Sequence, residues 1–270
     1  FDGCFHKISG LNVSGGAGGV GLFGTVNGGT IKNLSISGSV SGNSAYVGGI
    51  VGKTQGTVLI ENCSFSGSVT NSKSNAAAGT GGIAGRVNSG TLTITGCSNS
   101  GSISAASGAP GGILGAGQTN AVKISSCYNT GNISGQYYPS GICATNTKNT
   151  STIKNCYSIG EISNTNGGAY SAGISANFKG TASDCYSLYP EADALASNNN
   201  GKSTKITSPD GLLEKLGSDF TDDLSGTNGG YPLLSWQTSE EPQPQNPKLE
   251  ITGGPETVSM TNSGAEPTIT

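Results

Sequence analysis

The sequence predicts an all-β chain folded as a right-handed parallel β-helix, a solenoid of about six three-stranded coils closed by a small helix-containing cap. Three observations predict this fold. A unit of about thirty residues recurs along the chain. Its copies differ in length only in turns rich in Gly, Ser and Asn, and no helical spacing of apolar residues occurs between Val20 and Leu188. The right hand follows from the general rule for crossovers between parallel strands.

The clearest copy of the unit is residues 46–70, which hold three apolar pieces at 48–52, 57–63 and 67–70. Each piece is bounded by residues that form turns, and none could bury itself alone. Equivalent residues of successive coils should therefore stack in three inward columns. The first is expected to hold Leu22, Ile50, Ile83, Ile113, Ile142 and Ile174; the second Leu34, Cys63, Cys97, Cys127, Cys156 and Cys185; the third Val40, Val69, Ile103, Ile133 and Ile162.

A polar position precedes the second column in every coil. Its occupants are Asn33, Asn62, Gly96, Ser126, Asn155 and Asp184. Side-chain amides stacked in this way can bond along the column and to the backbone of the corner.

The chain divides at changes of composition. Residues 1–188 are the predicted β-helix, beginning with a lead-in coil, and 189–237 are the predicted cap over its open end. Within the cap, residues 208–217 have a Ser or Asp cap, helical apolar spacing and a terminal Gly, which predicts one short helix. Residues 238–247 are a Pro-rich linker, and 248–270 begin another β domain.

Composition excludes several classes of protein. The chain carries 13 Lys and Arg, including a single Arg, and its net charge is −3, so we expect no nucleic-acid partner. No apolar run is long enough to span a bilayer. Between Gly3 and Ser183 the only acids are Glu61 and Glu161, about three coils apart, so paired-carboxylate catalysis is not expected.

Seven cysteines could form disulfides, bind a metal or stay free. The five in the second column take the place of Leu34, and parallel Cβ vectors suit a disulfide poorly, so we expect buried free thiols there. Metal sites need converging ligands with spacings such as C-x-x-C, and none occurs, so no metal or cofactor is predicted. For Cys4 and Cys143 the sequence does not distinguish between a disulfide, a metal ligand and a free thiol.

The candidate ligand-binding residues are Tyr128, Tyr157 and Tyr186, each directly after a cysteine of the second column. Alternation along a strand turns them outward, so they should form an aromatic ladder, with Tyr137, Tyr138 and Tyr170 in nearby turns. Such a ladder could dock sugar rings. The alternative is that it only shields one corner of the solenoid.

Several segments resemble the GLUG-repeat proteins of bacterial cell surfaces. They are the lead-in FDG and HKISGL at 1–11, VGGIVG at 47–52, NCYSIG at 155–160 and NGGYPLLSWQ at 228–237. The resemblance implies a large secreted, wall-associated protein of Gram-positive type, with residues 248–270 similar to the start of a bacterial Ig-like domain. Some members carry a metallopeptidase domain specific for IgA. The zinc helix of such a domain needs two His residues, and this chain has one.

We therefore expect a non-catalytic structural or adhesive module, monomeric within a larger chain and exposed at the bacterial cell surface. Its partner would be a host glycan or an extracellular matrix protein. The alternatives are a polysaccharide lyase or hydrolase on the same fold, and a passive spacer in a larger surface protease.

Overall fold

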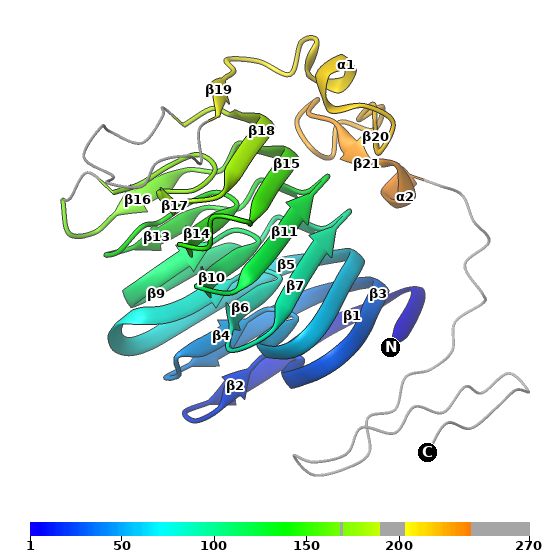
Figure 1. Ribbon diagram of the computed structural model, residues 1–270. Coiled ribbons are helices and arrows are strands. Elements are labelled where there is room, and N and C mark those ends of the chain that lie inside the picture. The colour runs from blue at the N-terminus through cyan, green and yellow to red at the C-terminus, as the bar shows by residue number, and fades with distance from the viewer. Residues whose placement is uncertain (168–169, 190–202, 239–270) are drawn as a thin grey trace, which may run out of the picture. The chain divides into compact units, whose positions relative to one another are not determined.

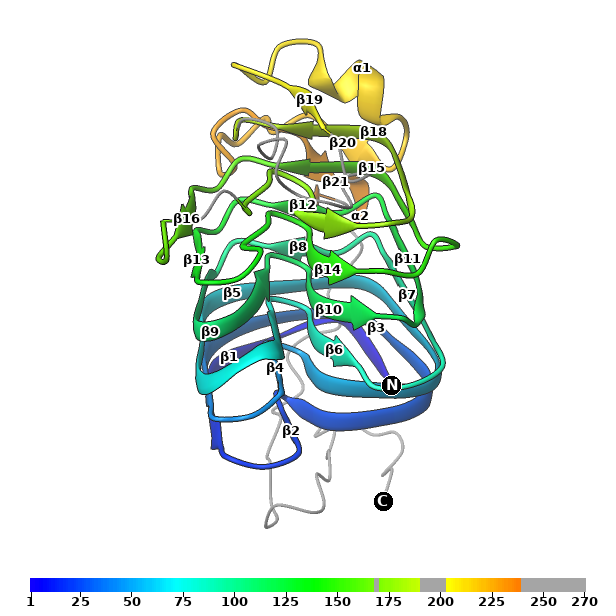
Figure 2. The ribbon, with the colours of Figure 1, turned by 60° about the vertical axis from the view of Figure 1, so that its left-hand side comes forward.

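A computed structural model describes residues 1–167, 170–189 and 203–238 (Figure 1). They belong to one compact unit, Phe1–Thr238. The predicted β domain at 248–270 lies outside the described residues, as does the predicted linker except for Thr238. Parallel strands stack in about six turns, which confirms the predicted solenoid (Figures 1 and 2).

Among the described residues, the solenoid is one sheet of 19 strands that winds around the stack, and the pairings within it are parallel. Its first coils contain long strands that pass through the corners without interruption, namely β1 (Asp2–Gly15), β3 (Phe23–Gly42) and β5 (Val51–Gly81). Three separate strands per coil were predicted. Pairing continues through these corners because residues such as Gly56 and Gly67 turn the chain at positive φ within the strand.

Shorter strands complete these coils and form the later ones. They are β2 (Gly19–Val20), β4 (Tyr46–Gly48), β6 (Ala84–Val87), β7 (Thr91–Thr95), β8 (Ser98–Asn99), β9 (Ser102–Gly111), β10 (Leu114–Gln118), β11 (Ala121–Ser125), β12 (Tyr128–Asn129), β13 (Ile133–Gly135), β14 (Cys143–Asn146), β15 (Thr152–Ser158), β16 (Ile162–Asn164), β17 (Asn177–Phe178), β18 (Thr181–Ser187) and β19 (Thr204–Lys205).

The three predicted inward columns are confirmed by register and burial. In the third column Val69 pairs with Ile103, and Ile133 pairs with both Ile103 and Ile162. The first column is held by main-chain bonds such as Ile83 N to Ile113 O, at 3.1 Å. All predicted members are buried except Leu22, which is partly buried at the first coil.

The polar position before the second column is a left-handed corner. All of its non-glycine occupants have φ between 49° and 55°, and Gly96 has φ of 59°. Asn, Asp and Gly tolerate this conformation better than other residues, which explains their recurrence. The predicted amide bonding occurs in the first coils, where Asn62 Nδ2 donates to Asn33 Oδ1 at 3.3 Å and Asn33 Nδ2 donates to Asp2 Oδ1 at 3.0 Å.

The cysteines are free thiols, as expected for the second column. All seven are unpaired, Cys4 being exposed and the other six buried. Each thiol of the second column donates to the carbonyl two residues before it, as Cys127 Sγ does to Ser125 O at 3.1 Å. Cys at this position therefore packs as a small apolar residue and also satisfies a carbonyl at the corner.

A fourth inward column was not predicted, and it changes from apolar to polar along the stack. It begins with Ile36 and Phe65, continues with Asn99 and Asn129, and ends with serines. Asn99 Nδ2 donates to Asn129 Oδ1 at 2.7 Å, and both side chains are fully buried. A buried polar group is tolerated when it is hydrogen-bonded, and here the amides bond along the column.

Residues 203–238, which we call the strap, lie mostly along the side of the solenoid. They contain α1 (Leu212–Leu216), β20 (Phe220–Thr221), β21 (Leu233–Leu234) and α2 (Ser235–Thr238), while β19 pairs with β18. The sequence predicted a cap at 189–237 over the open end, and residues 190–202 of that cap lie outside the described residues. Its α1 begins later than the predicted residue 208, and Gly211 precedes it without a side-chain cap bond. Neither helix is long and apolar enough to cross a membrane, within the residues described.

Candidate functional site

The predicted tyrosine ladder exists, but the strap covers it. Tyr128, Tyr157 and Tyr186 pair in register on adjacent coils and point outward from the solenoid. The rings of Tyr128 and Tyr157 are stacked at 5.0 Å with an angle of 5° between their planes. The exposed fractions of the three residues are only 4%, 0% and 9%. The expectation that the ladder is exposed to solvent is therefore wrong, and the shielding of one corner of the solenoid is the alternative that fits this burial.

Apolar strap residues form a second core with the ladder. It contains Ile206, Leu212, Leu216, Phe220, Tyr231 and Leu234 together with the three tyrosines. The ring of Phe220 lies 5.9 Å from that of Tyr157. The second core is separate from the one inside the coils, so the ladder is the surface on which the strap packs.

Polar contacts fix the strap to the ladder at the phenol groups. Tyr157 Oη donates to Pro232 O and accepts a bond from Asn228 Nδ2 at 2.7 Å, while Tyr128 Oη donates to Gln237 Oε1 at 2.9 Å. Burial, and then the proximity of Tyr128, raises the pKa of Tyr157 well above its ordinary value. Both phenols therefore remain neutral hydrogen-bond donors.

The loop before β21 positions Asn228. Asp223 accepts bonds from the backbone N–H groups of Asn228 and Gly230, at 2.7 and 3.0 Å, and from the hydroxyls of Ser225 and Thr227. Desolvation opposes ionisation, but these bonds outweigh it and lower the pKa of Asp223. One ionised carboxylate thus organises the loop that holds Tyr157.

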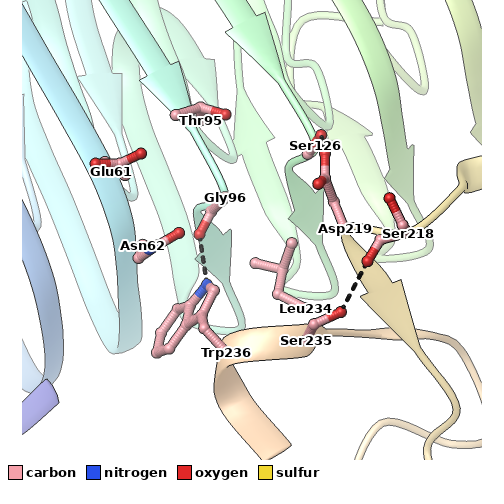
Figure 3. A pocket seen from close by; sticks show the side chains of 10 residues that line it. All are labelled: Glu61, Asn62, Thr95, Gly96, Ser126, Ser218, Asp219, Leu234, Ser235 and Trp236. Atoms are coloured by element: carbon pink, nitrogen blue, oxygen red, sulfur yellow. Dashed lines mark hydrogen bonds between the residues drawn. The ribbon is translucent and has the colours of Figure 1, made fainter. Parts of the chain in front are cut away.

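Where the strap meets the earlier coils, a groove of about 280 Å³ remains (Figure 3). Glu61 and Asn62 line it from the solenoid, and Asp219 and Trp236 line it from the strap. Figure 3 shows the indole donating to Gly96 O, a bond of 2.8 Å. The remaining lining residues are Thr95, Gly96, Ser126, Ser218, Leu234 and Ser235.

Polar groups of this groove bond within the strap and between the strap and the coils. Ser126 Oγ donates to Asp219 Oδ2 at 2.5 Å, and Ser235 Oγ donates to Ser218 O at 3.1 Å. The Trp236 ring also lies 5.9 Å from Phe5 of the first coil. In the described part of the chain, no three His, Cys, Asp or Glu residues gather in a way that could hold a metal ion.

Residues 43–70 match the family model of the GLUG motif. The chain carries a GLUG motif. The matched residues include the clearest copy of the repeat, residues 46–70. The fold is similar to the crystal structure of a "putative immunoglobulin A1 protease" from Bacteroides ovatus, with a TM-score of 0.60 and 21% identity, covering 87% of this chain and 77% of that one. No curated protein matches the sequence.

The sequence did not predict which surface of the coils the strap contacts, because no local sequence pattern indicates it. The strap reaches Tyr157 from 71 residues away and Ser98 from 139 residues away. The GLUG motif and the fold likeness explain the solenoid and leave its ligand open. The one signal in the sequence is the concentration of aromatic and aliphatic residues at 231–236. Such a segment could cover either the tyrosine ladder or the open end of the solenoid, so it did not distinguish between the two.

Proposed function

We propose that this chain is a non-catalytic binding module of an extracellular bacterial protein, associated with the cell wall, that presents a rigid β-helix to a host glycan or matrix protein. The GLUG motif and the fold of the Bacteroides protein support the extracellular bacterial setting. The paired main chain of the coils supports the presenting role, because a continuous parallel ladder holds surface side chains in fixed register.

The proposal that the module is non-catalytic rests on the contacts of the two carboxylates that line the groove, Glu61 and Asp219. Glycoside hydrolysis commonly needs a pair, one acting as acid and the other as base or nucleophile. Asp219 accepts a bond from Ser126 and so attaches the strap to the coil, a structural role, and Glu61 lines the same groove. Glu161 lies in the turn before β16, where its backbone N–H donates to Asn132 Oδ1. Glu61 lies in β5, where it pairs in register with Lys32 and Thr95, so the two glutamates belong to different strand stacks of the solenoid.

The test uses the full 270-residue chain on a polysaccharide panel and on an array of glycans and matrix proteins. We expect binding without release of reducing ends or unsaturated products. Turnover that Glu61→Gln abolishes and the matched Glu161→Gln leaves intact would show that the groove is catalytic and would overturn the proposal.

A second candidate is a passive spacer beside a protease domain. The fold likeness to a protein described as an immunoglobulin A1 protease favours it. The same array separates the two candidates, because a spacer binds no glycan and no matrix protein at any concentration that the array samples.

A further inference from the structure

Two of the nine tyrosines, Tyr138 and Tyr170, meet at a corner outside the second core. We call this pair the aromatic corner; Tyr137 precedes Tyr138 in the chain, and Tyr189 lies beside the pair through its contact with Ser171. Tyr170 is 41% exposed, which makes it one of three large apolar side chains that are exposed in the described part of the chain. Tyr137, Tyr138 and Tyr189 are half-buried.

The corner is built by equivalent positions of successive coils. Ser140 pairs with Ala172 in a parallel bridge, and each residue is preceded two positions earlier by a tyrosine. The rings of Tyr138 and Tyr170 consequently meet edge to face, 5.6 Å apart with an angle of 62°. Tyr189 joins them because its hydroxyl lies 3.1 Å from Ser171 Oγ.

The backbone under Tyr138 is held in an unfavourable conformation. Tyr138 has φ of 55°, in the left-handed region that a bulky side chain rarely adopts. Ser140 holds it there, because its buried hydroxyl donates to Tyr138 O at 2.9 Å and accepts from Ala176 N at 3.0 Å. Conformations of this kind persist where the surroundings enforce them and are concentrated at binding sites.

The two segments that supply the rings contain no charged residue: 132–146 and 162–178 lack Asp, Glu, Lys, Arg and His. Their exposed side chains include Thr165 and Asn166, and Gln136 is half-buried beside the tyrosines. Hydroxyl and amide groups next to aromatic faces suit a ligand that has both hydroxyls and C–H faces, and no charge favours an ionic one.

We propose that the aromatic corner binds a neutral sugar ring, which stacks on the exposed face of Tyr170 beside Tyr138 and is oriented by nearby amide and hydroxyl side chains such as those of Gln136 and Thr165. This inference rests on the proposed binding function and names its site and ligand class. The corner is distinct from the groove beside Trp236, whose polar groups hold the strap.

The experiment titrates the full chain with neutral hexasaccharides of glucan, mannan, galactan and chitin type, and with hyaluronan and heparin hexasaccharides as acidic probes. Two variants remove the rings, Tyr170→Ala and Tyr138→Gly. The matched control is Tyr46→Ala, since Tyr46 stands two residues before Gly48 at the equivalent position of an earlier coil.

We expect a neutral probe to bind and both ring-removing variants to weaken its affinity by at least about fivefold. Tyr138→Gly should do so without lowering the unfolding midpoint, because glycine adopts positive φ without strain. Tyr46→Ala should bind as the parent does. Unchanged affinity in both ring-removing variants overturns the site, as does binding of the acidic probes alone, and either result leaves the proposed binding module standing. If the chain binds none of these probes but binds a matrix protein on the array, the site is overturned and the binding module stands; if it also binds nothing on the array, both proposals are overturned.

Discussion

At the residue scale, four consecutive positions of each later coil meet four different environments. In the run from Asn155 to Ser158, the first residue turns the corner at positive φ, the second and fourth are buried inside, and Tyr157 points outward under the strap. Alternation along the strand predicts the inward and outward directions. It cannot predict that the outward side chain is also buried, because that depends on a segment distant in sequence.

The thiols provide a direct check of this arrangement. Cys4 is exposed and six cysteines are buried, and burial raises the pKa of Cys143 to about 12 and that of Cys97 well above its ordinary value. Because alkylation needs an accessible thiolate, we expect iodoacetamide to modify Cys4 alone in the native protein and all seven cysteines after denaturation. Mass spectrometry of the labelled chain measures both counts. Native labelling of Cys127 or its neighbours in the column would contradict the packing.

The fourth inward column makes Asn129 a sensitive position. Asn129→Ala removes the acceptor of the bond from Asn99 and the donor to Gly131 O, leaving buried polar groups unpaired. We expect the free energy of unfolding to fall by about 1–3 kcal/mol, measured in urea. Asn43→Ala, at an exposed position, is the control and should change stability little. Equal effects of the two substitutions would show that the buried amide is dispensable.

At the element scale, the strap decides which side of the solenoid is available to partners. Its apolar face packs on the three ladder tyrosines, and Trp236 and Gln237 bond to Gly96 and Ser98. Local sequence patterns predicted a short helix and an aromatic segment, and both are present. Their place on the side of the coils depends on long-range burial of aromatic surface.

Tyr157→Phe tests the polar attachment of the strap. The substitution keeps the ring stack but leaves Pro232 O without its phenol donor and removes one acceptor of Asn228. We expect a loss of about 1–2 kcal/mol in unfolding free energy and faster proteolysis within the strap. Tyr170→Phe, on the exposed corner, serves as the control. If both variants resist protease equally well, the phenol does not hold the strap.

The loop around Asp223 should make the strap sensitive to acid. The folded-state pKa of Asp223 lies below its ordinary value of 3.8, so its carboxylate stabilises the fold above that pH and loses this contribution as the pH falls through the folded pKa. Asp223→Asn should therefore lower the unfolding midpoint at about pH 6 and have a shrinking effect below about pH 3. Exposed Asp222→Asn is the matched control. A difference between Asp223→Asn and the parent that persists at the lowest pH would exclude this explanation.

At the scale of the whole unit Phe1–Thr238, the strap links coils that the solenoid connects only through their neighbours. It contacts Phe5, Gly96, Tyr128 and Tyr186. Each of these residues belongs to a different coil. Loss of the strap would remove this coupling and expose the aromatic ladder to water.

A chain that ends at residue 202 tests this coupling. We expect its unfolding transition to broaden and to move to lower urea concentration, because coils can then open in sequence from one end. We also expect increased binding of a hydrophobic dye, since Tyr128 and Tyr157 become exposed. Circular dichroism and dye fluorescence measure the two effects. A transition as sharp and as high as that of the full chain would mean that the coils alone supply the cooperativity.

The sequence by itself determined the coil, since a repeat of apolar, turn-forming and corner residues has few ways to bury its columns other than stacking. Ile50, Cys63 and Val69 were placed correctly because each repeats in its own column. Only the tertiary structure decided the fate of Tyr128, Tyr157 and Tyr186, and with it which aromatic residues face solvent. The physical reason is the sequence separation of the contacts. The periodicity of the repeat indicates contacts between neighbouring coils, whereas the strap buries its apolar face on residues more than 70 positions earlier in the chain.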